Sequence, residues 1–374
     1  MRNSDTLTAD LFETTVPAAP AVLPADAAGF EIGWDFAHYR LTPPAANLAP
    51  GQAVHQGWLA GGAVFGSRAL KPTPQVRAWL QLRLKAWQSG CAFEAVQVTP
   101  HFLGQIDAPV CPVTRTTLGS ARGTGNDAVV ERVGRGAGYA AGNLATLSLR
   151  AVQAKAALDW QQAMTLVRRL EASGMDTLDG LAPAQWTRLA VLMSFVTPLP
   201  HATAAALPLR VLPPNRLRLL NAVQALQTVV TLAFAQTQAL PRLRELMKQL
   251  PARAKHDFQV FVLTLQARRL AIGSQAEGMA LRQALEDAWA DAALLRRWQR
   301  FALQLDEAQC ERLVRIAGRL GLGGKAWQWL PGSAATEGWA LPAGGQSGPP
   351  QGWARRTPPV KARSAAPTMA ACKA

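Results

Sequence analysis

Apolar residues recur at helical spacing over most of the chain. After Pro74, which is a favourable first residue for a helix, the apolar positions 76, 79, 80, 84 and 87 follow a helical period until Gly90. A short helix is expected near residues 101–106. From residue 143 onward the pattern predicts successive helices, at about 143–158, 159–173, 183–196, 214–239, 241–249, 251–271, 276–302 and 306–320.

The helical period is absent from three stretches of the N-terminal half. Residues 29–74 mix aromatic residues with glycines and the pair Pro43-Pro44, which indicates an irregular or short-stranded entry segment. Residues 93–98 alternate weakly and predict a strand. Within the glycine-rich stretch 111–142, only residues 129–133 (VVERV) predict a strand.

These elements predict an α+β fold that is mostly α, with a small ββα-like module followed by an all-α helical domain. We expect a flexible N-terminal arm over 1–28, the α+β module over 29–157 and the all-α domain over 158–330. The last segment, 331–374, is rich in Gly, Pro, Ser and Ala, so we expect a disordered basic tail. This tail is either an electrostatic arm for nucleic acid or a solvated segment without a specific partner.

One uncharged stretch is long enough to span a bilayer, because residues 219–240 carry no charge over 22 residues. It contains several amide side chains, each of which would cost free energy in hydrocarbon unless it were paired. We therefore expect a buried helix of a soluble protein and no membrane partner. The amides are Asn221, Gln224, Gln227, Gln236 and Gln238.

The cysteines and the N-terminus favour a cytoplasmic location. The four cysteines are scattered without a CxxC spacing, so we expect free thiols in a reducing compartment and no structural zinc. The first residues carry acids where a signal peptide has a basic start. The five histidines form no paired metal-binding motif.

Hydrophobic residues make up 49% of the chain, which excludes disorder throughout. The net charge of +15 is distributed unevenly along the sequence. Residues 1–60 hold two basic and six acidic side chains, a net charge of −4. The net charge is +6 over 61–160, +9 over 161–330 and +4 over 331–374. An excess of this sign favours a polyanionic partner, which can be nucleic acid, an anionic membrane surface or an acidic protein.

The most informative motif lies between Cys111 and Lys155. Cys111-Pro112 is followed by Val130-Glu131-Arg132-Val133, then by Gly138-Tyr139 and Gly142-Asn143-Leu144, with Ser148, Ala151 and Lys155 after them. This order and spacing resembles the ββα-metal (HNH-like) endonuclease module. The resemblance assigns 130–133 to a strand, 142–144 to a strand-to-helix turn, and the last three residues to a helix. It covers about 45 residues of the chain.

The resemblance implies a metal-dependent nuclease site whose residues are only partly present. In that family a strand carboxylate and a helix side chain hold one divalent metal, and a neighbouring base activates water. Here Glu131 stands at the strand carboxylate position, Arg132 at the base position, and Val152 at the position of the helix ligand. Arginine cannot act as a base and valine cannot ligate metal. We therefore expect the shape of the module more than its chemistry.

The candidate catalytic residues implied by the resemblance are Glu131 and Asn143, with Glu131 as the ligand of Mg²⁺ or Mn²⁺ if the module is active. Asn143 has two interpretations: it caps a helix over 144–158, or it orients a catalytic side chain. Glu131 is either a metal ligand or an exposed strand carboxylate that pairs with Arg132 or Arg135. The candidate phosphate contacts, which are otherwise a solvated basic loop, are Arg115, Arg122, Arg132, Arg135, Arg150 and Lys155.

In the helical half, Arg296, Arg297 and Arg300 lie in sequence near Trp289 and Trp298. Such a combination either stacks bases or binds phosphate, or consists of core tryptophans with arginines at the rim. Two hypotheses for function follow. The first is nucleic-acid association through a degenerate HNH-like module, with weak or no metal-dependent cleavage. The second is a non-enzymatic helical scaffold or adaptor that binds a protein partner.

Overall fold

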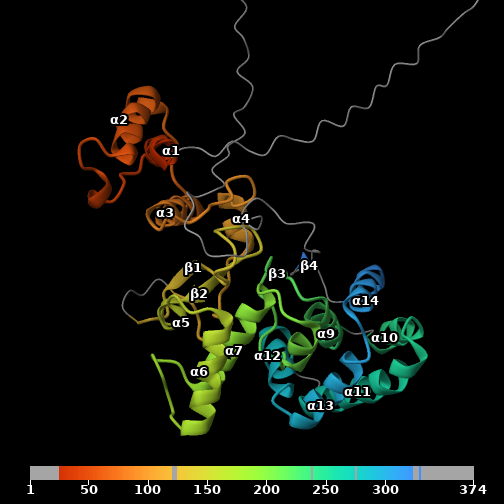
Figure 1. Cartoon of the computed structure of the whole chain (residues 1–374). Coiled ribbons are helices and arrows are strands. Elements are labelled where there is room, and N and C mark those ends of the chain that lie inside the picture. The colour runs from red at the N-terminus through yellow and green to blue at the C-terminus, as the bar shows by residue number, and fades with distance from the viewer. Residues whose placement is uncertain (1–24, 120–123, 237–238, 274–275, 323–327, 330–374) are drawn as a thin grey trace, which may run out of the picture.

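The computed structural model describes residues 25–119, 124–236, 239–273, 276–322 and 328–329 (Figure 1). Fourteen α-helices and a small two-stranded antiparallel sheet lie within these ranges. The expected α+β, mostly α fold is therefore confirmed. The basic tail over 331–374 and most of the expected N-terminal arm lie outside the described residues.

The entry segment is helical, so the expectation of an irregular or short-stranded chain over 29–74 is wrong. It forms a hairpin of two helices, α1 (Ala25–His38) and α2 (Ala53–Phe65). A Cβ atom on Gly33 would lie 1.9 Å from the backbone oxygen of Val54, and one on Gly57 would lie 1.9 Å from that of Phe30. The glycines therefore do not break helices; they let the two helix backbones touch.

Two single-turn 3-10 helices, η1 (Ala45–Asn47) and η2 (Gly66–Arg68), flank α2. The expected helices after Pro74 and near 101–106 are confirmed as α3 (Pro74–Gln88) and α4 (Pro100–Gln105). The strand expected over 93–98 is wrong. Phe93 forms only an isolated bridge with Tyr139, and the chain then turns into α4.

The sheet of the module consists of β1 (Ala128–Arg132) and β2 (Leu144–Ser148), followed by α5 (Leu149–Lys155). The strands pair antiparallel, with Glu131 opposite Ala145. The strand predicted at 129–133 is confirmed, whereas the helix predicted over 143–158 is wrong in its first part, because residues 144–148 form a strand that is buried along its whole length. Gly142-Asn143-Leu144 therefore leads into a strand, and the helix starts only after Ser148, whose hydroxyl accepts from the Ala151 amide.

The rest of the chain is helical, with a short parallel pair formed by β3 (Arg218–Leu219) and β4 (Gln328–Trp329). The helix predicted over 276–302 is two helices, because Asp291 caps the start of a new one with hydrogen bonds from the amides of Ala293 and Leu294. The helices are α6 (Trp160–Ser173), α7 (Pro183–Phe195), α8 (His201–Ala206), α9 (Ala222–Ala233), α10 (Ala239–Lys248), α11 (Ala252–Ala271), α12 (Gly278–Ala288), α13 (Ala292–Ala302) and α14 (Glu307–Arg319).

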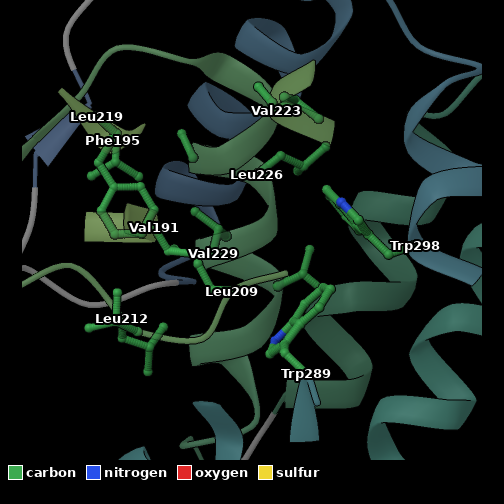
Figure 2. Packing of buried hydrophobic residues seen from close by; sticks show 14 of the residues in the cluster. Val191, Phe195, Leu209, Leu212, Leu219, Val223, Leu226, Val229, Trp289 and Trp298 are labelled. Carbon is green, nitrogen blue, oxygen red and sulfur yellow. The ribbon is translucent and has the colours of Figure 1, made fainter. Parts of the chain in front are cut away.

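The uncharged stretch contains the buried helix α9, whose burial was expected from the amides. The helix predicted over 214–239 is too long at both ends, because Arg218–Leu219 form β3 and α10 begins at Ala239. Figure 2 shows side chains of α9 lying between Phe195 on one side and Trp298 on the other. The amide of Asn221 donates to Ser194 O at 2.9 Å, and that of Gln227 donates to Leu207 O at 3.1 Å. In the part of the chain that the structure describes, no helix combines the length and the apolar character that a bilayer span requires.

The hairpin of the module contributes to both hydrophobic clusters of the described chain. Ala145 and Leu147 belong to the large cluster, which extends from Cys111 to Leu322 through the helices α6 to α14. Leu144 and Tyr139 belong to a smaller cluster under α1, α3 and α4. The strand β2 therefore packs between the two clusters, and its side chains are fixed by packing.

A buried ion pair joins the N-terminal hairpin to α3. Arg83 of α3 is 0% exposed and pairs with Asp35 of α1, while Glu31 lies at 3.6 Å. The guanidinium also lies 4.7 Å from the ring centroid of Trp79. This arrangement compensates a charge that could not otherwise be buried.

Candidate functional site

Glu131 lies in β1 and is 7% exposed. Its carboxylate forms an ion pair with Lys85 of α3 and accepts hydrogen bonds from the Arg132 amide at 3.1 Å and the Tyr139 hydroxyl at 3.5 Å. The interpretation of Glu131 as an exposed carboxylate paired with Arg132 or Arg135 is therefore wrong. The sequence offered no local signal for Lys85, which lies 46 residues earlier in the chain.

Lys155, at the end of α5, is 4% exposed. Among the residues that the structure describes, no hydrogen bond or ion pair is formed by its amino group. Burial lowers the pKa of Lys155 from 10.5; the Glu131 carboxylate opposes this, while Arg132, Lys85 and Arg135 lower the pKa further. The charge of the amino group is thus affected by one carboxylate and by three other cationic side chains.

Two arginines complete this cluster. The guanidinium of Arg132 lies 4.8 Å from the ring centroid of Tyr139 and donates to Ala137 O at 3.4 Å. Arg135 is exposed and donates to the backbone oxygen of Ala157 at the end of α5. Burial and then the Glu131 charge raise the pKa of Tyr139, so its phenol stays protonated at neutral pH.

We call this cluster the basic site. It contains more positive than negative charge, because it holds one carboxylate and four cationic side chains. Its elements are α3, β1, the loop after β1, and α5. The residues of the basic site are Lys85, Glu131, Arg132, Arg135, Tyr139 and Lys155.

The basic site does not fit a divalent cation. A hard cation such as Mg²⁺ takes six oxygen ligands, usually from carboxylates, carbonyls and water. Glu131 already pairs with Lys85, and the groups around it are cationic or phenolic. Across the described ranges, no group of three or more His, Cys, Asp or Glu side chains could hold a metal ion. We therefore derive no chemical step through a metal.

Asn143 is fully buried and holds the loop between the strands. Its amide nitrogen donates to Gly134 O at 2.9 Å, Gly138 O at 3.0 Å and Ala137 O at 3.2 Å, and its side-chain oxygen accepts from Gly134 N at 2.9 Å. The interpretation of Asn143 as a helix cap is wrong, because β2 follows it. All of its side-chain hydrogen bonds described here serve to close this loop.

Arg115 lies apart from the basic site and ties the loop before β1 to α12. It donates to Asp287 at 2.8 Å and to Glu286 at 3.0 Å. Burial alone would lower the pKa of Arg115, but these two carboxylates outweigh that effect and raise it. Its charge is thus compensated within the chain, which leaves little for a phosphate.

The remaining candidate phosphate contacts are spread over the module. Arg150 of α5 donates to Thr124 O at 3.4 Å, at the opposite end of the hairpin from the loop that Asn143 closes. Arg122 lies outside the described residues. Of the residues expected to contact phosphate, the structure brings Arg132, Arg135 and Lys155 together around Glu131.

Comparison of the chain with protein-family models, with curated proteins and with solved structures finds no match. The resemblance to the HNH-like module therefore rests on the residues named above and on the chain order β1, β2, α5.

Proposed function

We propose that this chain binds nucleic acid through its phosphate backbone at the basic site, with little or no metal-dependent cleavage of the strand. The observation that carries the proposal is the grouping of Lys155, Arg132 and Arg135 with the ion pair between Lys85 and the buried Glu131. Such an excess of positive charge attracts phosphates whatever the base sequence.

Lys155 supplies a physical reason for an anion to bind there. Its burial disfavours the charged amine, and the neighbouring cations add to that cost. A phosphate oxygen next to the amine would favour the charged form and offset both effects. Arg135 is exposed beside it and can present its guanidinium in the planar geometry that suits a phosphate.

The absence of efficient cleavage follows from the residues at the expected catalytic positions. Glu131 is paired with Lys85, and the base position holds Arg132, which has no acceptor for a proton. Tyr139 hydrogen-bonds Glu131, but its raised pKa keeps it protonated, so it cannot serve as the base instead. Val152, at the position of the second ligand, is apolar.

A salt titration of binding tests this proposal. The affinity for a labelled DNA duplex is measured between about 50 and 200 mM salt, for the wild type and for Arg135→Gln/Lys155→Met. Each lost phosphate contact reduces the slope of log K against log salt by about 0.9, so the loss of the exposed Arg135 is expected to make the slope shallower by at least about 0.9, and the loss of the buried Lys155 charge is expected to reduce it further. The charge-matched control is Arg312→Gln/Arg319→Gln on α14, where both arginines are exposed.

Two outcomes would overturn the proposal. One is a wild-type protein that does not bind the duplex at about 50 mM salt. The other is a basic-site variant whose slope equals that of the control. Cleavage is tested separately with supercoiled plasmid and Mg²⁺ or Mn²⁺. We expect no nicking by the wild type above that by Glu131→Gln; metal-dependent nicking that this substitution abolishes would contradict the expectation.

A further inference from the structure

A second cluster of cations lies on the helical part of the chain, along α13. The tryptophans near it in sequence belong to the core: Trp289 is 1% exposed and Trp298 is 0% exposed. Their rings lie 5.9 Å apart, edge to face, and pack on Phe261 and Phe301. Neither ring is available to stack a base, so the base-stacking interpretation is wrong, and the tryptophans are core residues with arginines at the rim. Arg296, Arg297 and Arg300 lie on the exposed side of α13.

These arginines form one wall of a groove between α11 and α13. The groove has a volume of about 380 Å³, and Val260 and Ala293 supply apolar surface within it. Arg296, Arg297 and Arg300 are all exposed. Arg297 donates to the Thr264 hydroxyl. Within the described part of the chain, the side chains of Arg296 and Arg300 form no hydrogen bond or ion pair.

The acidic side chain in the groove, Asp257, does not neutralise these arginines. Its carboxylate accepts a hydrogen bond from the Gln304 amide, and no ion pair within the described residues joins it to an arginine. Arg253 nearby is directed to the backbone oxygen of Gln304 at 2.9 Å. The wall therefore presents more positive charge than the groove contains negative charge.

We propose that the groove between α11 and α13 is a second phosphate-binding surface, which takes the backbone of a DNA strand. Arg296 and Arg300 are one helical turn apart, which is about 6 Å along the axis. The two long side chains therefore project from the same side of α13, where each can reach a phosphate of one strand. Guanidinium groups bind such oxygens with two hydrogen bonds.

A DNA backbone fits this groove better than an acidic peptide does. An acidic peptide brings backbone N–H donors as well as carboxylates, and the side chains that line the groove offer three arginine donors against the acceptors of His256 and Asp257. A DNA backbone brings only acceptors, which guanidinium donors satisfy.

This surface goes beyond the proposed function, because α13 lies well apart from β1 and α5 (Figure 1). It can therefore be tested independently of the basic site. Arg296→Gln/Arg300→Gln removes two exposed charges without breaking a hydrogen bond in the described chain, so the fold is expected to survive. Far-UV circular dichroism and thermal unfolding of each variant check this.

The test is the same salt titration, with a labelled single strand of about 20 thymidines and the full chain. A single strand releases about 0.7 counterion per contact, so we expect the slope for Arg296→Gln/Arg300→Gln to be shallower by about 1.4 than that for Arg312→Gln/Arg319→Gln. A slope equal to that of the control overturns the inference. Displacement of the strand by polyglutamate at equal charge concentration, as effective as displacement by unlabelled strand, also overturns it.

The two proposals fail separately. If Arg135→Gln/Lys155→Met weakens binding and the groove variant does not, the basic site stands and the groove is excluded. If the groove variant alone weakens binding, the groove stands and the proposed function of the basic site is excluded. A shallower slope in both variants supports two contact surfaces on the chain.

Discussion

The loop closed by Asn143 offers a direct test of whether this residue has a structural role. In Asn143→Ala, the backbone oxygens of Gly134, Ala137 and Gly138 lose their side-chain donor, and the amide of Gly134 loses its acceptor. All of these bonds are buried, so water does not replace them easily. Because the loop precedes Tyr139, which contacts Glu131, the change also loosens one side of the basic site.

The expected cost follows from the number of hydrogen atoms. The amide nitrogen of Asn143 has two hydrogens for its three carbonyl partners, and the side-chain oxygen accepts one bond. Three buried hydrogen bonds at about 1 kcal/mol each predict a loss of about 3 kcal/mol in the free energy of unfolding. Unsatisfied carbonyls left behind would add to this loss.

Urea unfolding and amide hydrogen exchange together measure this effect. Urea gives the change in the free energy of unfolding, and exchange at Gly134 reports on the loop itself. Asn126→Ala is the matched control, since Asn126 lies in the same module and its side chain makes no hydrogen bond described here. We expect this control to stay within about 0.5 kcal/mol of the wild type.

A stable Asn143→Ala protein would refute the reasoning. If its free energy of unfolding and its exchange at Gly134 equal those of Asn126→Ala, the hydrogen bonds do not close the loop. If such a stable variant also lost a metal-dependent nicking activity of the wild type, Asn143 would instead orient a catalytic side chain.

Three further predictions concern packing and titration. Gly33→Ala is expected to open the α1–α2 hairpin to limited proteolysis, because its Cβ would lie 1.9 Å from Val54 O, whereas Gly62→Ala, with nothing within 4 Å, is expected to leave the digestion pattern unchanged. The pKa of Lys155 in the folded protein lies below its unfolded value of 10.5, so at a pH between the folded and the unfolded pKa the unfolded chain binds more protons and stability rises with pH. The urea midpoint of Lys155→Met is expected to lack this rise with pH. Burial raises the pKa of the Cys310 thiol to about 12, so mass spectrometry after iodoacetamide treatment at pH 8 is expected to find Cys91 labelled and Cys310 unlabelled; labelling of folded Cys310 would contradict its burial.

The spacing of apolar residues predicted those helices whose buried face is formed by residues close together in the sequence. The helix α3 follows from Pro74 and its apolar spacing. The burial of α9 inside the protein follows from amide side chains that need hydrogen-bond partners. Periodicity failed where a glycine serves packing instead of turning, as at Gly33 and Gly57. It also failed at β2, because five residues that are all buried carry no alternation that separates a strand from a helix.

The candidate site was predictable only in part, for a different reason. The motif located Glu131, Arg132, Arg135 and Lys155 in one module, and their proximity follows from the short hairpin and helix. The partner of Glu131 comes from α3, where Lys85 is separated from it by 46 residues. That contact depends on how the two clusters pack on the hairpin, which no local pattern encodes.

The ion pair of Arg83 determines how far the chain can be shortened at its N-terminus. Arg83 and Lys85 belong to the same helix, so the position of α3 that brings Lys85 to Glu131 also buries Arg83 against Asp35. A chain that began after Asp35 would lose most of α1, and with it both carboxylates that pair with Arg83 and the side chains of Ala28 and Ile32 that pack in the same cluster as α3. We therefore expect that a fragment retaining the basic site must include α1.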